Sequence, residues 1–369
     1  MAEKKTRSIF EDASTNTPTE AAPSPGAAAK EKSANRGRIR FWQIVLALLV
    51  VAMVVIGGLT RLTDSGLSIT EWNLVTGVLP PLSQEAWAAE FAKYQKIPEF
   101  QEVNSAMTLA EFKPIYWWEW GHRFLGRIVG LVFIVPFLWF FTRKTIPAGW
   151  TKRLLIPGIL IGIQGVLGWW MVTSGLTERI DVAPYRLATH LGLAFIIFAL
   201  LVWNIFCLGH EEHELLAARR RRFKPLLGLG GVATALIFLQ ILVGAMVAGL
   251  DAGTMYNDWP LMGGAFLPDS SAEGVWQFIH RMLGYLILCV VLMFWLNGRA
   301  LGHAQVRFWT TVAFMWVMAQ VVWGIVTLMG GADWFHSIVH QSGALLLMFV
   351  MMRAKFEIAY PTEQKIART

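Results

Sequence analysis

Charged residues are scarce in this chain. They make up 15% of its 369 residues, whereas hydrophobic residues make up 55%. A soluble domain usually has about a quarter of its residues as Asp, Glu, Lys and Arg. The shortage of charge therefore excludes an ordinary soluble globular protein of this length.

Cysteine is scarce as well, with two residues in the whole chain, Cys207 and Cys289. Both fall within apolar runs at different depths, so a disulfide between them is not expected. Without cysteines near the histidines, a tetrahedral zinc site is disfavoured. The net charge of +7 is no signal for nucleic acid, because the basic residues gather in a few connectors between apolar runs.

Apolar runs long enough to cross a bilayer recur along the chain. A helix needs about 20 apolar residues to span roughly 30 Å of hydrocarbon. The sequence thus predicts an all-α integral membrane protein with eight transmembrane helices. The runs lie near residues 41–59, 120–141, 154–174, 187–209, 225–249, 275–298, 308–330 and 334–352.

The distribution of Lys and Arg predicts the orientation of these helices. Basic residues crowd the N-terminal tail, the even-numbered connectors (as in "RRRRFK") and the C-terminal tail. The positive-inside rule then places both termini and the even connectors in the cytoplasm. The N-terminal segment lacks the Arg- and Ser-rich amphipathic pattern of a transit peptide, which favours a bacterial inner membrane over a mitochondrial one.

The chain contains two similar halves. "GGLTRLTDSGLSITEWNLVTGVLPP" from Gly57 matches "GAMVAGLDAGTMYNDWPLMGGAFLP" from Gly244, and "GHRFLGR" matches "IHRMLGY". A Gln-x-x-x-Gly spacing recurs at Gln164 and Gln320. Such internal similarity predicts two tandem, pseudo-symmetric four-helix bundles.

The repeat also predicts the domain boundaries. The extra segment 82–113 of the first outer loop is typical of an amphipathic helix lying on the outer surface. The expected parts are a disordered cytoplasmic tail (1–38), the N-terminal half (39–210, with a long outer loop at 60–113), a basic cytoplasmic linker (211–224), the C-terminal half (225–356) and a cytoplasmic tail (357–369).

Four histidines are predicted to lie at one depth. His122, His190 and His280 stand about 20 residues before the cytoplasmic boundary of their runs, near the outer edge of the hydrocarbon. His340 has the same place in the eighth run, with His336 one turn outward as its rival. The remaining histidines lie in cytoplasmic connectors and are expected to be solvated: His210, His213 and His303.

Two histidines per half, on different helices, suit an iron porphyrin. Neutral imidazole is a usual axial ligand of heme iron, and a bundle core accommodates such cofactors. A hydrogen-bonded core histidine and a proton relay remain as alternatives. The spacing favours two bis-histidine heme sites, with metal ligands His122, His190, His280 and His340. Arg123 and Arg281, which follow two of these ligands, could bind anionic propionates or could simply extend to the interface.

One acidic residue distinguishes the halves. Glu119 lies three residues before His122 on the same helical face, whereas Gln277 occupies this place in the second half. A carboxylate beside a heme can transfer protons or stabilise a developing cation. A salt bridge from Glu119 to Arg123 or Lys113 is the alternative. The difference predicts chemistry in the first half and a resident heme in the second.

These motifs together resemble the heme A synthase family, of the kind found in alphaproteobacteria and mitochondria. The resemblance rests on "EWGH", the two H-R-x-L-G motifs, the long string from Gly57 and the eight-span duplication, over about residues 40–355. It implies an oxidoreductase that converts the C8 methyl of heme O to a formyl group by successive hydroxylations, giving heme A for terminal oxidases. Some members carry a cysteine pair in their outer loops; this chain has none there, so no thiol role is carried over.

The resemblance also implies roles for single residues and partners. Glu119 would be the essential acid, His122 and His190 would flank the substrate heme O, and His280 and His340 would hold a heme b. The implied partners are membrane lipid, the heme O synthase (a farnesyltransferase) and oxidase assembly factors, with no nucleic acid; a homo-oligomer is left open.

Two other functions compete with this one. A di-heme b-type electron carrier linked to quinol would use the same four ligands but would place its hemes on opposite sides of the bilayer. A transporter built from repeats would need broken helices and a site at mid-depth, and the apolar runs have no paired charges there.

Overall fold

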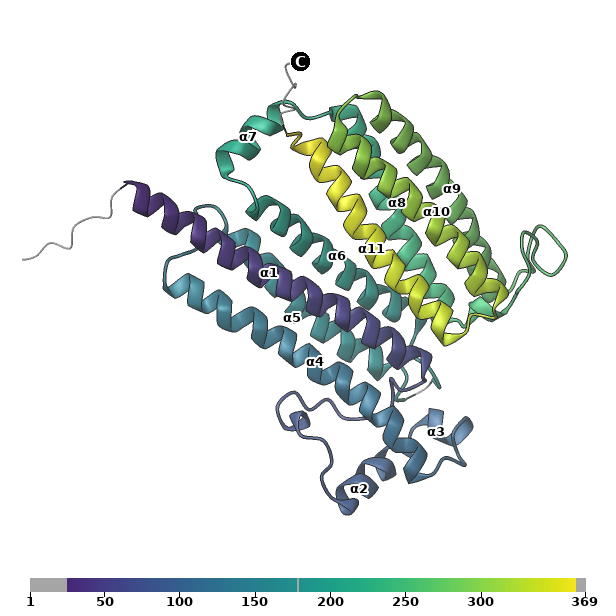
Figure 1. Cartoon of the computed structure of the whole chain (residues 1–369). Helices are drawn as coiled ribbons and strands as arrows, with labels where there is room; N and C mark the ends of the chain where they lie inside the picture. Colours follow the sequence, from purple (N-terminus) through teal and green to yellow (C-terminus); the bar gives the residue numbers. More distant parts are fainter. Residues whose placement is uncertain (1–24, 178, 363–369) are drawn as a thin grey trace, which may run out of the picture.

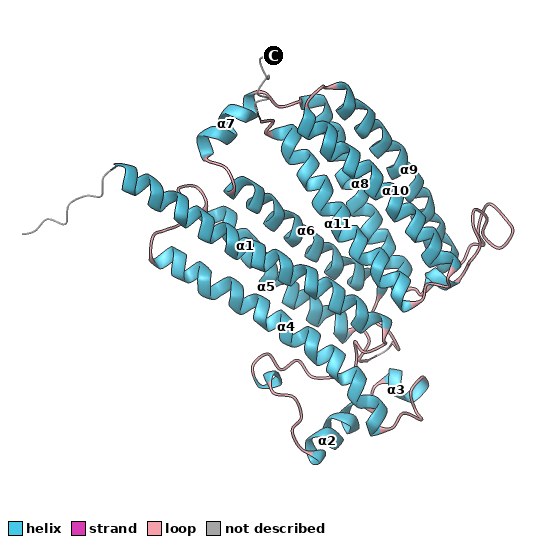
Figure 2. Ribbon diagram, in the orientation of Figure 1, coloured by secondary structure: helices cyan, strands magenta, loops and turns pink. Residues whose placement is uncertain are grey.

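Long helices dominate the protein (Figure 1). The computed structural model describes residues 25–177 and 179–362, and within them Figure 2 shows helices and loops but no strand. In the described part of the chain, eight helices are long and apolar enough to cross a membrane, which confirms the predicted all-α membrane protein with eight spans. They are α1 (Pro25–Leu62), α4 (Leu109–Thr142), α5 (Thr151–Thr173), α6 (Pro184–Leu208), α8 (Lys224–Gly249), α9 (Ala272–Ala300), α10 (Ala304–Met329) and α11 (Trp334–Ala359).

The connectors define two ends of the bundle. The cap end carries the segment 63–108, here named the cap, together with the loops 174–183, 250–271 and 330–333. The opposite, basic end carries the short helix α7 (Glu212–Arg220) and the connectors rich in Lys and Arg. The 3-10 turns η1 (Thr76–Val78) and η2 (Ala252–Thr254) belong to the loops of the cap end.

The cap does not form the single amphipathic helix predicted for residues 82–113. It contains two short helices, α2 (Gln84–Tyr94) and α3 (Pro98–Glu102), and residues 109–113 already belong to α4. The prediction fails at Pro98, which has no amide hydrogen to continue α2 and instead starts a new helix at its first position. α4 then begins early because Thr108 and Glu111 form a capping box, which stabilises a helix start by about 1 kcal/mol.

Aromatic side chains attach the cap to the start of α4. Tyr94 and Phe112 are fully buried, with ring centroids 5.2 Å apart, and Trp87 meets Tyr116 edge to face at 5.0 Å. Aromatic pairs of this kind contribute about 1 kcal/mol beyond their buried area. The cap is therefore packed on the same helix that carries Glu119 and His122.

The same packing pattern occurs in both halves. In the first, α1 packs on α4, α4 on α5, α5 on α6, and α6 back on α1; in the second, α8, α9, α10 and α11 repeat this ring. The halves meet where α6 and α11 pack on each other, α6 on α8 and α11 on α1. This arrangement is the one that a pseudo-twofold axis along the bundle would produce, and it supports the predicted pseudo-symmetry.

Matching residues at the cap end have matching conformations. Asp64 after α1 and Asp251 after α8 both adopt the left-handed region, with φ of 48° and 51°. Arg61 donates to both carboxylates, at 3.0 Å to Asp64 and 2.8 Å to Asp251. One guanidinium thus joins the two halves at equivalent turns.

The predicted N-terminal tail is too long. Residues 1–24 lie outside the described residues, but α1 begins at Pro25 rather than after residue 38. The Ala- and Lys-rich stretch from Ala27 has high helix propensity, so the membrane helix continues into it. Arg36 is buried and donates to the backbone carbonyls of Cys207, at 3.0 Å, and His210, which fixes this extension against the end of α6.

One acidic residue of the cap is buried without a counter-charge of its own. Glu99 on α3 is 6% exposed, and its Oε2 has no hydrogen-bond partner among the described residues. Burial raises the pKa of this carboxyl to about 8, with smaller upward effects of Asp64, Asp181 and Glu119 and an opposing effect of Arg61. Glu99 is thus protonated in the folded protein at neutral pH.

Glu99→Gln is expected to remove a loss of stability at alkaline pH. The folded-state pKa of Glu99 lies above its ordinary value of 4.5. The stabilising contribution of the protonated Glu99 side chain is therefore fully present below about pH 4.5 and is lost as the pH rises through about 8. The variant should therefore gain on the order of a few kcal/mol over the wild type at about pH 9 and little at about pH 5. Thermal unfolding in detergent measures both, with Glu102→Gln, an exposed neighbour on α3, as the control. Equal gains at both pH values would contradict the burial of an unpaired carboxyl.

Candidate functional site

Each candidate histidine lies against a glycine of the neighbouring helix. A Cβ placed on these glycines would lie 2.8–3.1 Å from the Cε1 atom of the imidazole, closer than side chains normally approach. A larger residue at any of the four would displace the ring. The pairs are Gly57 with His122, Gly168 with His190, Gly244 with His280 and Gly324 with His340.

The structure brings the histidines of the second half together. The ring centroids of His280 and His340 lie 6.4 Å apart, with an interplanar angle of 75°. Two metal–nitrogen bonds of about 2 Å, plus about 1 Å from each nitrogen to its ring centre, add up to about 6 Å. The spacing therefore fits two axial imidazoles on one iron. In the first half, His122 lies within electrostatic range of His190.

One ring nitrogen of each of the four histidines lacks the partner that a structural core histidine would have. The Nδ1 atoms of His122, His190, His280 and His340 are all buried without a hydrogen-bond partner among the described residues. A buried imidazole that serves only packing normally has its nitrogens satisfied. This observation favours the ligand interpretation over the hydrogen-bonded alternative.

The rival in the eighth span, His336, has a different environment. Its Nδ1 contacts the Asp333 carboxylate, and its backbone carbonyl accepts from Trp323 Nε1 at 3.1 Å. His336 therefore lies in the first turn of α11, against the N-cap residue Asp333. His340, one turn further along, faces His280. The expectation that His303 is solvated is wrong: this residue is buried, caps α10 and contacts the carbonyl of Thr362.

Gly57→Ala tests the close approach of α1 to His122. The added Cβ would lie 2.8 Å from Cε1, so the ring must move from its place. We expect porphyrin binding in the first half to weaken about tenfold or more, as when the group that orients a metal ligand is disturbed. Gly121→Ala on α4 is the control, because its Cβ would meet no atom within 4 Å. Porphyrin titration of the two purified variants measures the difference; equal affinities would refute the steric role of Gly57.

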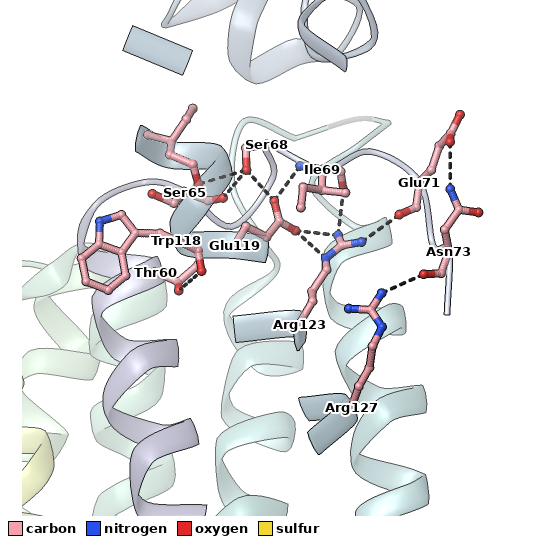
Figure 3. A network of polar contacts seen from close by, with 11 residues as sticks. Thr60, Ser65, Ser68, Ile69, Glu71, Asn73, Trp118, Glu119, Arg123 and Arg127 are labelled. Carbon is pink, nitrogen blue, oxygen red and sulfur yellow. Dashed lines mark hydrogen bonds and ion pairs between the residues drawn. The ribbon is translucent and has the colours of Figure 1, made fainter. Parts of the chain in front are cut away.

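Glu119 lies at the centre of a polar network between α4 and the cap (Figure 3). The side chain is buried, with a residue exposure of 3%. Oε2 accepts from Ser68 Oγ at 2.8 Å and from the Ile69 amide at 2.6 Å, and Oε1 accepts from Arg123 Nε at 3.0 Å and Nη2 at 2.5 Å. Both carboxylate oxygens are thus engaged by donors from the cap and from α4. The salt bridge to Arg123, named above as the alternative for Glu119, is present.

The second half has a corresponding network, with a neutral residue at its centre that donates to its loop instead of accepting from it. Gln277, also 3% exposed, donates to the Tyr256 carbonyl at 3.2 Å and accepts from Arg281 at 3.4 Å. Arg281 in turn donates to the carbonyls of Asp258 and Leu261 at 3.0 and 2.9 Å. A neutral residue can therefore occupy this place in the fold, where the loop of the second half offers carbonyl acceptors and the loop of the first half offers donors.

The arginines proposed to bind propionates are engaged with the loops. Arg123 donates to the carbonyls of Ile69 and Glu71 at 2.7 and 2.8 Å as well as to Glu119, and its guanidinium lies over the Trp72 ring. Arg127, one turn along α4, donates to the carbonyl of Asn73 (Figure 3) and to that of Leu74. A propionate contact of Arg123 or Arg281 stays a prediction, and both arginines already hold a loop against their helix.

Sequence reasoning missed several polar residues of the site. Ser68 lies in the repeated string, but nothing in the sequence marks it as a partner of Glu119. Gln164 and Gln320 occupy matching positions in the two halves, but the sequence gives them no role. In the structure, each donates from its side chain to the backbone carbonyl of a histidine on the next helix. Alignment of the two halves also places Gln240 of α8 at the position that Met53 occupies in α1.

Comparison with known proteins gives a consistent result. Residues 40–352 match the model of the family described as cytochrome oxidase assembly protein. Similar curated proteins are the heme A synthases of Ruegeria pomeroyi, 51% identical, and Ruegeria sp. strain TM1040, 48% identical, each over 98% of both chains. The heme A synthase of Dinoroseobacter shibae is 49% identical over 97% of both chains.

Proposed function

Because the chain belongs to the cytochrome oxidase assembly protein family, we propose that it has the activity of a heme A synthase. The enzyme is an oxidoreductase that converts the C8 methyl of heme O to a formyl group. Two successive hydroxylations and the loss of water give the aldehyde of heme A. Heme O is the substrate, and terminal oxidases use the product.

The observation that carries this proposal is the buried carboxylate present in one half and absent from the other. Glu119 lies one helical turn from His122, held by four donors, whereas Gln277 lies at the matching place before His280. We assign substrate binding to His122 and His190. Glu119 is then the residue that accepts a proton or stabilises positive charge at the substrate methyl.

The second half would hold a resident heme b between His280 and His340. Their ring spacing, the glycines beside them and their unpartnered Nδ1 atoms fit a pair of residues that would hold the heme iron. When bound, such a heme supplies one-electron transfer. The residues of this half orient the ligand rings and have Gln277 at the place where the first half has the carboxylate of Glu119.

We place the enzyme in the bacterial inner membrane, with its basic end and both termini in the cytoplasm. The eight apolar helices show a multi-pass membrane protein, and the basic connectors all emerge at the end away from the cap. The histidines then lie toward the outer side. Heme O synthase is the partner that this substrate implies.

Conversion of supplied heme O tests the proposal. The chain is produced together with a heme O synthase, purified in detergent, and its porphyrins are extracted and separated by chromatography. We expect heme A to form, with heme b and residual heme O bound to the protein. Two equivalents of heme b, with no farnesylated porphyrin bound or converted, would instead support the di-heme electron carrier.

A further inference from the structure

Three of the four histidines are tied to a neighbouring helix by a glutamine side chain. Gln164 on α5 donates to the carbonyl of His190 at 2.9 Å, and Gln320 on α10 donates to the carbonyl of His340 at 3.1 Å. Gln240 on α8 donates to the carbonyl of His280 at 2.9 Å, and its amide nitrogen lies 3.4 Å from Nε2 of the same histidine. Each amide joins two helices at the level of the imidazole.

His122 has no such bond. The residue of α1 that matches Gln240 is Met53, at the same distance along the chain as Gly57 is from Gly244. Both side chains occupy the same place: a Cβ on Gly126 would lie 3.7 Å from Met53 Cε, and one on Gly284 would lie 3.5 Å from Gln240 Nε2. A thioether cannot donate a hydrogen bond. Within residues 25–177 and 179–362, no side chain donates to the His122 carbonyl.

Near this level, one long bond of α1 reaches α4, from Thr60 Oγ1 to the Trp118 carbonyl at 3.5 Å, and leaves the His122 carbonyl without a side-chain donor (Figure 3). The other bond leads away from α4. Gln341, the residue after His340, donates to the Val54 carbonyl at 2.8 Å and so ties α1 to α11. α1 and α4 are joined nearer the basic end, where Trp42 donates to the Val132 carbonyl at 2.7 Å. On the cap side, α4 is held mainly through the loop bonded to Glu119 and Arg123, beside that single long bond from Thr60 of α1.

Resting on the function proposed above, we propose that Met53 and Gln240 are positioning residues that give the two sites different exchange behaviour. His122, without an amide tie, is the ligand that opens to admit heme O and to release heme A. His190, His280 and His340 keep their positions. The half that must exchange its porphyrin thus has the looser ligand, and the half with a resident heme has both ligands tied.

The exchange of these two residues between the halves tests this inference. Wild type, Met53→Gln, Gln240→Met and the double variant are purified and loaded with heme O and heme b. The transfer of each porphyrin to apomyoglobin is followed and resolved by chromatography. An interhelical hydrogen bond in a membrane protein is worth about 0.6 kcal/mol, which corresponds to about a threefold change in rate. Met53→Leu, which adds no donor, is the control.

We expect Met53→Gln to slow the release of heme O about threefold and Gln240→Met to speed the release of heme b by a similar factor. Gln240→Met should also raise the fraction of high-spin ferric iron in electron paramagnetic resonance spectra, because a looser imidazole leaves the iron more often. Unchanged release and spectra in Gln240→Met would overturn the inference, even if Met53→Gln fails to accumulate. Changed release rates in a protein that makes no heme A would contradict the proposed function and leave the positioning roles intact.

Discussion

Glu119→Gln is expected to abolish heme A formation while leaving the protein folded and its porphyrins bound. General acid–base groups contribute about 100-fold or more to a rate, so the output should fall by at least that factor. Heme O should then accumulate in the purified variant, because its binding rests on the histidines and not on the carboxylate. Chromatography of the extracted porphyrins measures both quantities.

The structure explains why this variant should fold. An amide at this place keeps an oxygen that can accept from Arg123, as Gln277 accepts from Arg281 in the second half. Its NH2 would lie beside Ser68 and the Ile69 amide, which are donors, so the substitution removes the charge and these two loop bonds while a buried amide of the same shape remains. Glu119→Ala would be less informative, since it would leave the buried donors of Arg123 and Ser68 without their acceptor.

The reciprocal variant, Gln277→Glu, is the matched control. It adds a carboxylate to the second half beside Arg281 and leaves Glu119 in place, so heme A formation should continue. Normal heme A output from Glu119→Gln would remove this residue from the mechanism. Loss of every porphyrin from that variant would show that its role is in folding the site.

His340→Ala is expected to cost the protein its resident heme. Loss of a group that only orients a metal ligand weakens binding 10- to 100-fold, so removal of the ligand itself should weaken it by at least about 100-fold. The alanine also leaves a space beside Gly324 that no other imidazole of α11 fills, because His336 contacts Asp333. Purified His340→Ala should thus lack heme b, as measured by its reduced-minus-oxidised spectrum.

His336→Ala serves as the comparison within the same helix. It removes an imidazole four residues away and breaks the contact with Asp333 while leaving the His280–His340 pair intact. Heme b should stay bound in this variant. If His336→Ala loses the heme and His340→Ala keeps it, the ligand of the eighth span has been assigned to the wrong residue.

Much of the fold follows from the sequence because the membrane restricts the choices. A run of about 20 apolar residues must satisfy its backbone internally, so the eight helices follow directly from composition. The duplicated strings identified which segments correspond, and with them the matching of His122 to His280. The apolar pattern did not predict the helix ends outside the membrane, where individual residues determine them. Pro98 divides the predicted cap helix, and α1 begins at Pro25, before its apolar run.

The site was predicted in part for a similar reason. Histidines at one depth can be counted along a helix, but hydrogen bonds between distant segments cannot. The bonds from Ser68 and the Ile69 amide to Glu119 depend on how the loop after α1 returns over α4. The sequence shows Gln164 and Gln320 only as a residue type that recurs in both halves, and the structure identifies the histidine carbonyls to which they donate. The difference between Met53 and Gln240 could have been found by extending the comparison of halves by one helical turn.

We assign different porphyrins to the two histidine pairs, with the acid beside one of them. The porphyrin content of His190→Ala and His340→Ala, each purified from cells that make heme O, tests this assignment. The structure predicts that His190→Ala retains heme b and loses the farnesylated porphyrins, and that His340→Ala does the reverse. Loss of the same porphyrin from both variants would contradict the account.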